Sequence, residues 1–326
     1  MTLAEDAHAV LLPVLDGLTL PAWAEDFLRA GGRALLLGET REEYVARRMS
    51  EHRRRTERAE AFTALARRAA ETAGAPVLIA VDQEPDGIQR LHGLVAPLSE
   101  PAAEPVAAAL ATAADARALG VTMFLSPVLD VLTGENPWLA GRTMAADPAE
   151  VARLGAAFIQ GTQAAGVLAV AKHFPGYRAL PADPAVTDTE LHGTLADLEP
   201  GLAPFRAAID AGVAAVMLGP ATVTALDAQQ PASTSPPVTR LLRNGLGFTG
   251  LIVTDDLDAP ATARGRSLTD TAVAALTAGA DLLLLAGGPH LPELATAIDR
   301  AVADRRLNPD RLRTAAAQVR SHTPTP

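Results

Sequence analysis

The stretch Gly250-Leu-Ile-Val-Thr-Asp-Asp-Leu257 is an apolar run that a glycine precedes and two acidic residues follow. Such a run is typical of a buried strand whose last residues carry chemistry. A second apolar run, Gly166-Val-Leu-Ala-Val170, leads in the same way into Ala171-Lys-His-Phe-Pro-Gly176. Both stretches therefore predict reactive side chains, above all Asp255, at the carboxyl end of a strand.

Six further apolar segments extend this pattern along the chain. The eight predicted strands cover residues 10–15, 34–37, 77–81, 121–125, 167–171, 214–218, 251–254 and 281–285. Segments with helical spacing lie between them, including residues 41–73, 102–119, 149–165 and 268–278. Because strand and helix alternate eight times, the sequence predicts an α/β protein with a single (β/α)8 TIM-type barrel rather than a doubly wound sheet. We expect one domain, residues 1–320, and a tail, residues 321–326.

Signals at the ends of the predicted helices agree with this alternation. Asp147 before Pro148 predicts an N-cap followed by proline at the first helical position. The stretch from Ser267 to Asp270 resembles a capping box. The helices are predicted to stop at glycines that can turn the chain back, namely Gly31, Gly120, Gly166, Gly212 and Gly279.

The composition excludes several classes of site and partner. Of the 326 residues 48% are hydrophobic, which is enough for a large core, and none is cysteine, which excludes disulfides and thiolate chemistry. The net charge of -10 argues against nucleic acid as a partner. No segment reaches the roughly 18 apolar residues of a membrane span, and the first residues lack the basic region of a signal peptide. We therefore expect a cytoplasmic protein that has no membrane partner; the oligomeric state stays open.

Two motif matches do not predict a cofactor or a metal. Gly245-Leu-Gly-Phe-Thr-Gly250 has the spacing of a dinucleotide-binding fingerprint, but it precedes a strand, whereas the fingerprint must follow one. Asp82-Gln-Glu-Pro-Asp-Gly87 begins like a calcium loop, but Gly93 stands where that loop requires a bidentate glutamate. We predict no cofactor and no metal.

Polar residues follow four of the predicted strands, namely Asp82 and Glu84, Asp130, Lys172 and His173, and Asp255 and Asp256. In a barrel these strand ends converge, so the residues can line one pocket. Neighbours on a strand point to opposite sides, and we expect Asp256 to point away from the pocket that Asp255 faces. Lys172 could form a Schiff base if burial removed its proton, or serve as a fixed cation for a substrate hydroxyl or carboxylate; the adjacent His173 favours the second reading.

A series of motifs resembles glycoside hydrolase family 3, specifically the single-domain β-N-acetylhexosaminidases of the NagZ type. The series runs in order over residues 35–286 and comprises Val81-Asp-Gln-Glu84, Ser126-Pro-Val-Leu-Asp130, Gly141-Arg142 before Asp147-Pro148, Lys172-His-Phe-Pro-Gly176, Pro231-Ala-Ser-Thr-Ser235, Leu246-Gly-Phe248 and Thr254-Asp-Asp-Leu257. The resemblance implies the same barrel fold and a retaining glycosidase, in which one carboxylate attacks the anomeric carbon and a second group protonates the departing oxygen.

The resemblance also implies a role for each matched residue. Asp255 falls on the nucleophile of the family. The residues that would hold the hydroxyls and the acetamido group of the sugar are Asp82, Arg90, Arg142, Lys172 and His173. The partner that this implies is a carbohydrate or glycoconjugate.

The sequence departs from the family at the proton donor. In NagZ-like enzymes Lys-His-Phe-Pro-Gly is followed by His-Gly and then by Asp-Ser-His, whose Asp-His dyad is the general acid/base on a mobile loop. Counting without gaps from Gly176 places Asp183-Pro-Ala185 on that motif. Asp183 is then the remnant of the dyad, and Ala185 replaces its histidine. Tyr177 replaces the histidine of His-Gly, and Pro220 replaces another histidine of the family after the sixth strand.

Three readings of this departure are open. The loop could supply a substitute acid/base from Asp183, Asp188, Glu190 or His192; the substrate could need little protonation; or the barrel could bind a sugar without cleaving it. We favour a hydrolase that cleaves a β-linked N-acetylhexosaminide or related sugar through a covalent intermediate on Asp255, with altered or reduced activity. The alternative is a catalytically inactive, sugar-binding member of the same barrel family.

Overall fold

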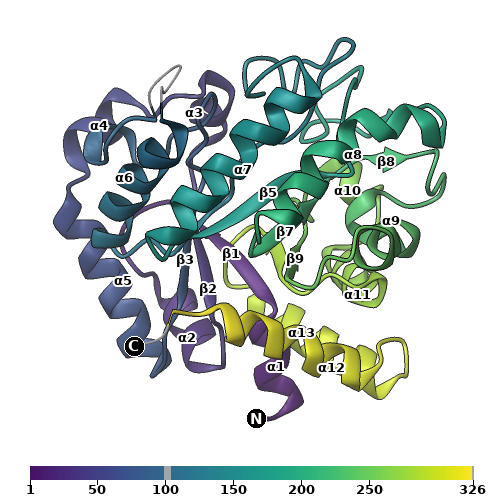
Figure 1. The fold of residues 1–326 in the computed structure, drawn as a ribbon. Coiled ribbons are helices and arrows are strands. Elements are labelled where there is room, and N and C mark those ends of the chain that lie inside the picture. The colour runs from purple at the N-terminus through teal and green to yellow at the C-terminus, as the bar shows by residue number, and fades with distance from the viewer. Residues whose placement is uncertain (99–103, 325–326) are drawn as a thin grey trace.

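The computed structural model describes residues 1–98 and 104–324, and these residues form a barrel of parallel strands surrounded by helices (Figure 1). The barrel strands are β1 (Leu11–Leu15), β2 (Ala34–Leu37), β3 (Leu78–Val81), β4 (Met123–Phe124), β5 (Leu168–Phe174), β7 (Ala215–Leu218), β9 (Leu251–Val253) and β10 (Leu283–Leu285). They lie in the order β10-β1-β2-β3-β4-β5-β7-β9, and a parallel bridge between Val253 and Leu282 joins the two ends. The predicted (β/α)8 barrel is confirmed, and all eight strands coincide with predicted segments.

Successive side chains of a barrel strand alternate between two apolar environments. On β2, Ala34 and Leu36 belong to the core inside the barrel, whereas Leu35 and Leu37 belong to the core between strands and helices. Because both faces of the strand are buried, the sequence of such a strand is continuously apolar. This continuity is the reason that the strands could be predicted from short apolar runs.

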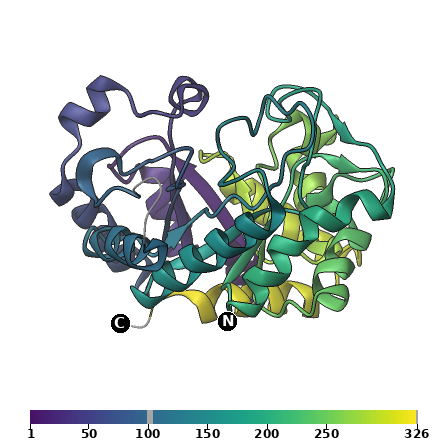
Figure 2. The ribbon, with the colours of Figure 1, turned by 45° about the horizontal axis from the view of Figure 1, so that its top comes forward.

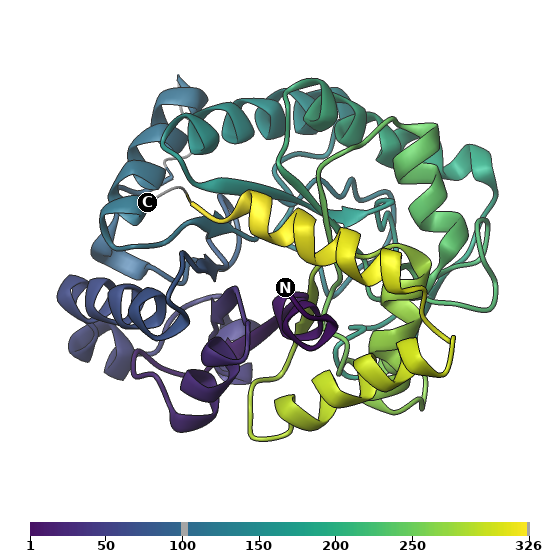
Figure 3. The same cartoon turned by 90° about the horizontal axis from the view of Figure 1, so that it is seen from below.

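The helices form the outer layer and close one end of the barrel. They are α1 (Leu3–Ala9), α2 (Ala22–Arg29), α3 (Arg41–Ala46), α4 (Glu51–Thr56), α5 (Ala59–Ala73), α6 (Pro105–Ala118), α7 (Pro148–Ala164), α8 (Leu195–Asp210), α9 (Pro236–Arg240), α10 (Pro260–Ala263), α11 (Leu268–Ala278), α12 (Leu291–Ala303) and α13 (Pro309–His322). Seen from below, α13 crosses the barrel beside α1 (Figure 3). An ion pair of 2.6 Å between Arg320 of α13 and Asp6 of α1 joins the two helices. The amino-terminal end of the barrel is therefore covered.

The predicted signals at the helix ends agree with the structure. The Asp147 side chain accepts a hydrogen bond from Ala149 at the start of α7, and Ser267 accepts one from Asp270 at the start of α11. All five glycines at which helices were predicted to stop have positive φ, and at Gly279 φ is 116°. A residue with a side chain would be strained there, which explains the choice of glycine.

Some predicted boundaries differ from the structure. The predicted helix at 41–73 consists of three helices, because Arg47 adopts a left-handed conformation after α3 and Ser50 caps a new helix. The helix predicted at 102–119 is observed as α6, and its first two predicted residues lie outside the described residues. Helix α13 continues through His322, so the first two residues of the predicted tail at 321–326 are helical.

Several short elements were not predicted. Strands β6 (Glu190–Leu191) and β8 (Thr222–Val223) form a small parallel sheet of their own, and three single turns, η1 (His92–Leu94), η2 (Ala232–Thr234) and η3 (Leu241–Gly245), lie in connections. Long connections gather above the barrel when the top of the molecule is turned forward (Figure 2). None of the helices in the described ranges has the length and apolar character needed to cross a membrane.

Candidate active site

A cavity of about 430 Å³ lies at the carboxyl ends of the barrel strands. Every barrel strand, or the connection that follows it, contributes to its lining, from Val14 on β1 to Leu284 on β10. Five of the seven predicted site residues line this cavity, namely Asp82, Arg142, Lys172, His173 and Asp255. The convergence of strand ends has therefore brought together residues that lie 173 positions apart in the sequence, from Asp82 to Asp255.

Two cations of the site are held by two carboxylates. The ammonium Nζ of Lys172 lies 2.5 Å from Oδ1 of Asp82 and 2.9 Å from Oε1 of Glu84. Arg142 donates from Nη2 and Nε to the two carboxylate oxygens of Glu84, at 2.7 and 3.1 Å. This bidentate geometry fixes the guanidinium in one orientation. The site therefore presents cations whose positions are set before any ligand binds.

The pKa of Lys172 follows from these contacts. Burial alone would lower the pKa of this ammonium, but the negative charges of Asp82 and Glu84 outweigh burial and raise it above its ordinary value. An amine must lose its proton to attack a carbonyl group. Lys172 is therefore a fixed cation, and its geometry does not support the Schiff-base reading.

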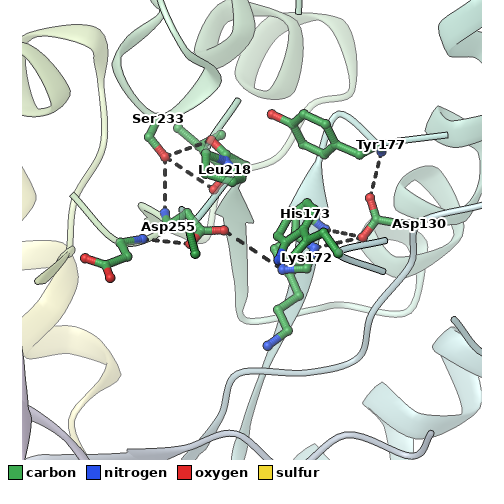
Figure 4. A network of polar contacts seen from close by, with 12 residues as sticks. Asp130, Lys172, His173, Tyr177, Leu218, Ser233 and Asp255 are labelled. Carbon is green, nitrogen blue, oxygen red and sulfur yellow. Dashed lines mark hydrogen bonds and ion pairs between the residues drawn. The ribbon is translucent and has the colours of Figure 1, made fainter. Parts of the chain in front are cut away.

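His173 lies between two aspartates (Figure 4). Its Nδ1 bonds to Oδ2 of Asp130 at 2.8 Å, and its Nε2 lies 4.0 Å from Oδ2 of Asp255. Because a carboxylate only accepts, Nδ1 carries the proton and Nε2 faces Asp255. Asp130 also accepts from the backbone N–H of Tyr177, so its own position is set from two sides. The ring of Trp138 packs against the His173 ring, with 4.4 Å between centroids.

The connection after β9 presents Asp255 to the cavity. The backbone N–H of Asp255 donates to the carbonyl of Leu218 and to Oγ of Ser233, both at 3.1 Å, as Figure 4 shows for Ser233. Burial raises the pKa of the Asp255 carboxyl, while positive charge on His173 opposes this shift. A carboxylate can act as a nucleophile in its ionised form, which the nearby cations favour. The geometry thus fits the chemistry predicted for this residue.

Asp256 corrects one expectation. We expected its side chain to point away from the pocket, but Asp256 lines the cavity together with Asp255. Strand β9 ends at Val253, so the alternation of side chains along a strand no longer applies at Asp256, three residues later. Burial, and then the neighbouring charge of Asp258, raise the pKa of Asp256 to about 7.

Arg90 stays a predicted substrate-binding residue, but it lies outside the described cavity lining. The resemblance predicts that Arg90 binds substrate, but its side chain is fully buried and is not part of the described cavity lining. Its guanidinium pairs with both carboxylate oxygens of Glu57, at 2.7 and 2.9 Å, and Nε donates to the carbonyl of Gly38 at 3.0 Å. These contacts do not support a direct role in substrate binding. They make Arg90 a support for the connection after β2.

The loop that should carry the acid/base dyad lies at the cavity, but its aspartate is engaged elsewhere. Pro184 and Ala185 line the cavity. Oδ2 of Asp183 pairs with Arg41 at 2.7 Å, and Oδ1 accepts from the N–H of Ala185 at 2.9 Å. Both carboxylate oxygens of Asp183 are therefore occupied. The side chain that projects from position 185 is a methyl group and cannot exchange a proton.

The substitute donors suggested by the sequence also lie outside the described lining. Arg264 pairs with Asp188 at 3.3 Å and with Glu190 at 3.1 Å, and His192 lies 3.9 Å from Glu190. The exposed fraction of the His192 side chain is 75%. In this conformation none of the three side chains is placed to protonate a group in the cavity.

Tyr177, which the resemblance places where the family has a histidine, fills space beside the site. It is fully buried, and its hydroxyl donates to the carbonyl of Ala221 at 2.9 Å. Its ring packs edge-on against Trp138, with 5.8 Å between centroids. Gly219 leaves room for the ring, since a Cβ there would lie 2.0 Å from a ring carbon of Tyr177. Tyr177 therefore packs behind the cavity, whereas Pro220 lines it.

Sequence reasoning missed several residues of the lining, and Glu39, Tyr44 and Trp138 are among them. The Tyr44 hydroxyl accepts from Nε1 of Trp138 and from Nη1 of Arg142, each at 2.9 Å. A compositional signal could have pointed to the aromatic pair: the chain has only two tyrosines and two tryptophans, and three of these four lie in or against the site. Glu39 is an acidic residue just after the apolar run of β2, and this position could have pointed to it as a site residue.

The site holds no arrangement typical of a metal centre. Within residues 1–98 and 104–324 no group of three or more histidine, aspartate and glutamate side chains could hold a metal ion. Two of the acidic residues there are paired with cations: Asp82 with Lys172, and Glu84 with Lys172 and Arg142.

Comparison with known proteins places these observations in a family context. A family model described as the glycosyl hydrolase family 3 N-terminal domain matches residues 43–321. A beta-hexosaminidase of Nitrosomonas eutropha is 33% identical over 231 residues, which are 66% of this chain and 66% of that protein. A beta-hexosaminidase of Methylococcus capsulatus is 33% identical over 253 residues, which are 74% of this chain and 75% of that protein. The alignment thus spans slightly less than two thirds of the Nitrosomonas protein.

Solved structures agree over nearly the whole chain. A glycoside hydrolase family 3 beta-N-acetylglucosaminidase from Paenibacillus sp. FPU-7 has a TM-score of 0.87 and 27% identity, and the match covers 99% of this chain and 62% of that chain. A beta-N-acetylhexosaminidase from Beutenbergia cavernae has a TM-score of 0.84 and 27% identity, and the match covers 99% of this chain and 98% of that chain.

Proposed function

Since the chain belongs to glycosyl hydrolase family 3, as its motifs predict, we propose that it is a glycoside hydrolase acting on β-linked N-acetylhexosaminides. The single observation that carries this proposal is the placement of Asp255 in a cavity beside His173, with Lys172 and Arg142 also in the lining. A cavity of about 430 Å³ lies within the range of pockets for small ligands.

The proposed reaction retains configuration at the anomeric carbon. A carboxylate oxygen of Asp255 attacks that carbon, the bond to the leaving oxygen breaks, and the leaving oxygen takes up a proton. Water then hydrolyses the resulting ester and restores the Asp255 carboxylate. In this scheme Asp82, Lys172, Arg142 and His173 hold the sugar through hydrogen bonds, and burial strengthens each of these contacts.

The weak point of this reaction is the first proton transfer. General acid catalysis contributes roughly 10²–10⁴-fold to a rate. Ala185 and the engaged Asp183 leave the loop without its usual donor, so we propose low activity on glycosides with poor leaving groups. Activated glycosides, whose leaving group needs little protonation, should be cleaved at rates that depend mainly on Asp255.

Covalent trapping tests the proposal directly. A 2-fluoro glycoside with an activated leaving group should form one stable adduct, detected by the intact mass of the protein. The Asp255→Asn variant should form none. Absence of an adduct on the unaltered protein, or an equal adduct on the variant, would remove Asp255 from the role of nucleophile.

A second candidate function is sugar binding without cleavage, and the methyl group of Ala185 at the cavity favours it. Calorimetry with N-acetylglucosamine and with a β-linked disaccharide should then give binding and no heat of hydrolysis over a long incubation. Turnover of the disaccharide at a rate ordinary for a glycosidase would end this second candidate. The substrate class in both candidates is a carbohydrate or glycoconjugate.

A further inference from the structure

The carboxyl group of Glu39 reaches the cavity without a bonding partner. Glu39 lines the cavity, and its Oε2 is buried with no hydrogen bond to any residue in the described part of the chain. Buried polar atoms are nearly always bonded, so such an atom at a ligand site indicates a contact that the ligand completes. The other acids nearby are engaged: Asp82 and Glu84 with Lys172, and Glu57 with Arg90.

The position of Glu39 follows from strand register. Strands β2 and β3 are parallel, and Leu36 pairs with Ala80. Glu39 lies three residues beyond Leu36, and Asp82 lies two residues beyond Ala80. The two carboxyl groups therefore emerge from adjacent strand ends. In agreement, burial and then the charge of Asp82 raise the pKa of Glu39 to about 8.

The backbone on both sides of Glu39 is held in place. Gly38 donates from its N–H to the carbonyl of Leu15 at 3.0 Å and accepts from Nε of Arg90 at 3.0 Å. On the other side, Thr40 caps helix α3. Because the backbone at Glu39 is already held, only the side chain loses conformational freedom when a ligand binds, which favours selective binding.

We propose that Glu39 is a specificity residue that hydrogen-bonds to a hydroxyl group of the sugar, at the same end of the cavity as Asp82. This inference rests on the proposed function and extends it. A hydroxyl group can donate to Oε2 whether the carboxyl is neutral or ionised. A carboxylate or phosphate group at the same place would face Asp82, so the site should reject acidic derivatives of the sugar at that position.

The alternative role for Glu39 is that of the missing proton donor. In a retaining glycosidase the donor and the nucleophile are only about 5–5.5 Å apart. The charges that act most strongly on Glu39 are those of Asp82, Lys172, Arg90 and Glu84, and Asp255 is not among them. Moreover, β2 is adjacent to β3 and is separated from β9 by β1 and β10. These relations favour a contact with a remote hydroxyl group over proton donation.

The proposal is tested by measuring kcat/KM for a series of substrates with wild type and with several variants. The series comprises 4-nitrophenyl N-acetyl-β-glucosaminide and its 3-, 4- and 6-deoxy analogues, and the proteins are wild type, Glu39→Ala, the near-isosteric Glu39→Gln and the exposed control Glu60→Gln. For one deoxy position the wild-type kcat/KM should fall about 10-fold or more. Glu39→Ala should lower kcat/KM for the parent sugar similarly, yet leave that deoxy analogue nearly unchanged, because the same contact is already absent.

Two outcomes would overturn the proposal. An equal loss for every sugar in Glu39→Ala, with Glu39→Gln folded, would show that Glu39 contacts no particular hydroxyl group. A loss that grows as the leaving group becomes poorer, measured with 2,4-dinitrophenyl, 4-nitrophenyl and methyl glycosides, would make Glu39 the proton donor instead. If the wild type cleaves no glycoside, the proposed hydrolase function fails by itself. The same proteins are then compared by the Kd values of N-acetylglucosamine and its deoxy analogues. If Glu39→Ala weakens the binding of every sugar equally, the proposed contact with one hydroxyl group is wrong.

Discussion

Nε2 of His173 lies 4.0 Å from Oδ2 of Asp255, and the opposite nitrogen of the same ring bonds to Asp130. Asp130 thus determines which nitrogen faces the proposed nucleophile. Asp130, which is buried behind the site, therefore influences the protonation of the His173 nitrogen that lies next to Asp255. Through His173, a residue in the connection after β4 thus acts on the proposed nucleophile in the connection after β9.

Asp130→Asn should lower kcat/KM on an activated glycoside by about 10–100-fold, the usual effect of losing an orienting carboxylate. An amide can donate to Nδ1, which changes the preferred tautomer of His173 and the proton on Nε2. The measurement is kcat/KM against pH, because the charge on His173 acts on Asp255. The control is Asp210→Asn at the exposed end of α8. Unchanged kinetics in Asp130→Asn would show that the orientation of His173 has no catalytic effect.

Ala185→His should raise activity on methyl and other unactivated glycosides by about 10-fold or more, and change activity on 4-nitrophenyl glycosides little. The reason is that position 185 lines the cavity and that a histidine there could protonate the leaving oxygen. Val186→His is the matched control, since Val186 is 59% exposed and lies outside the described lining. An equal change of activity in the two variants would show that a missing proton donor at position 185 does not limit the rate.

Glu57→Ala should lower the free energy of unfolding by about 3–5 kcal/mol at pH 7, because it leaves Arg90 buried without its carboxylate. Burial by itself raises the pKa of Glu57, but hydrogen bonds from His92 and Arg90 outweigh burial and lower the pKa from 4.5 to about 2. The stability that Glu57 contributes is therefore present above pH 4.5 and lost as the pH falls toward 2. Urea unfolding at pH 7 and pH 3 measures this effect. The difference in the free energy of unfolding between wild type and Glu57→Ala should be smaller at pH 3.

Glu39→Gln should gain stability relative to wild type as the pH rises. The pKa of Glu39 is raised from 4.5 in the unfolded chain to about 8 in the folded protein. The folded state therefore favours the protonated form, and wild type loses stability as the pH increases between these two values. Thermal unfolding at pH 5 and pH 9 measures the difference in Tm. Glu60→Gln, at an exposed position, should follow wild type at both values. If the difference in Tm between Glu39→Gln and wild type is the same at pH 5 and pH 9, the pKa of Glu39 is not raised.

The sequence by itself determined the architecture and the family. Each barrel strand is buried on both faces, so its apolar run is continuous and readable without any partner strand. The glycines and capping residues between the runs act through local backbone geometry, which is also encoded in neighbouring residues. For the same reason three residues could be predicted to share one site, namely Lys172 and His173 near the carboxyl end of β5 and Asp255 just beyond β9.

Only the tertiary structure decided which side chains share the cavity and which are engaged elsewhere. Arg90 matches the family by spacing, but its guanidinium pairs with Glu57, 33 positions away, and it is not part of the described lining. The resemblance assigns Asp183 to the acid/base motif, but Arg41, 142 positions away, bonds to one of its carboxylate oxygens. Glu39 and Trp138 join the site from connections without a recognised motif. Ion pairing and burial depend on distances between residues remote in sequence, and those distances arise only when the barrel closes.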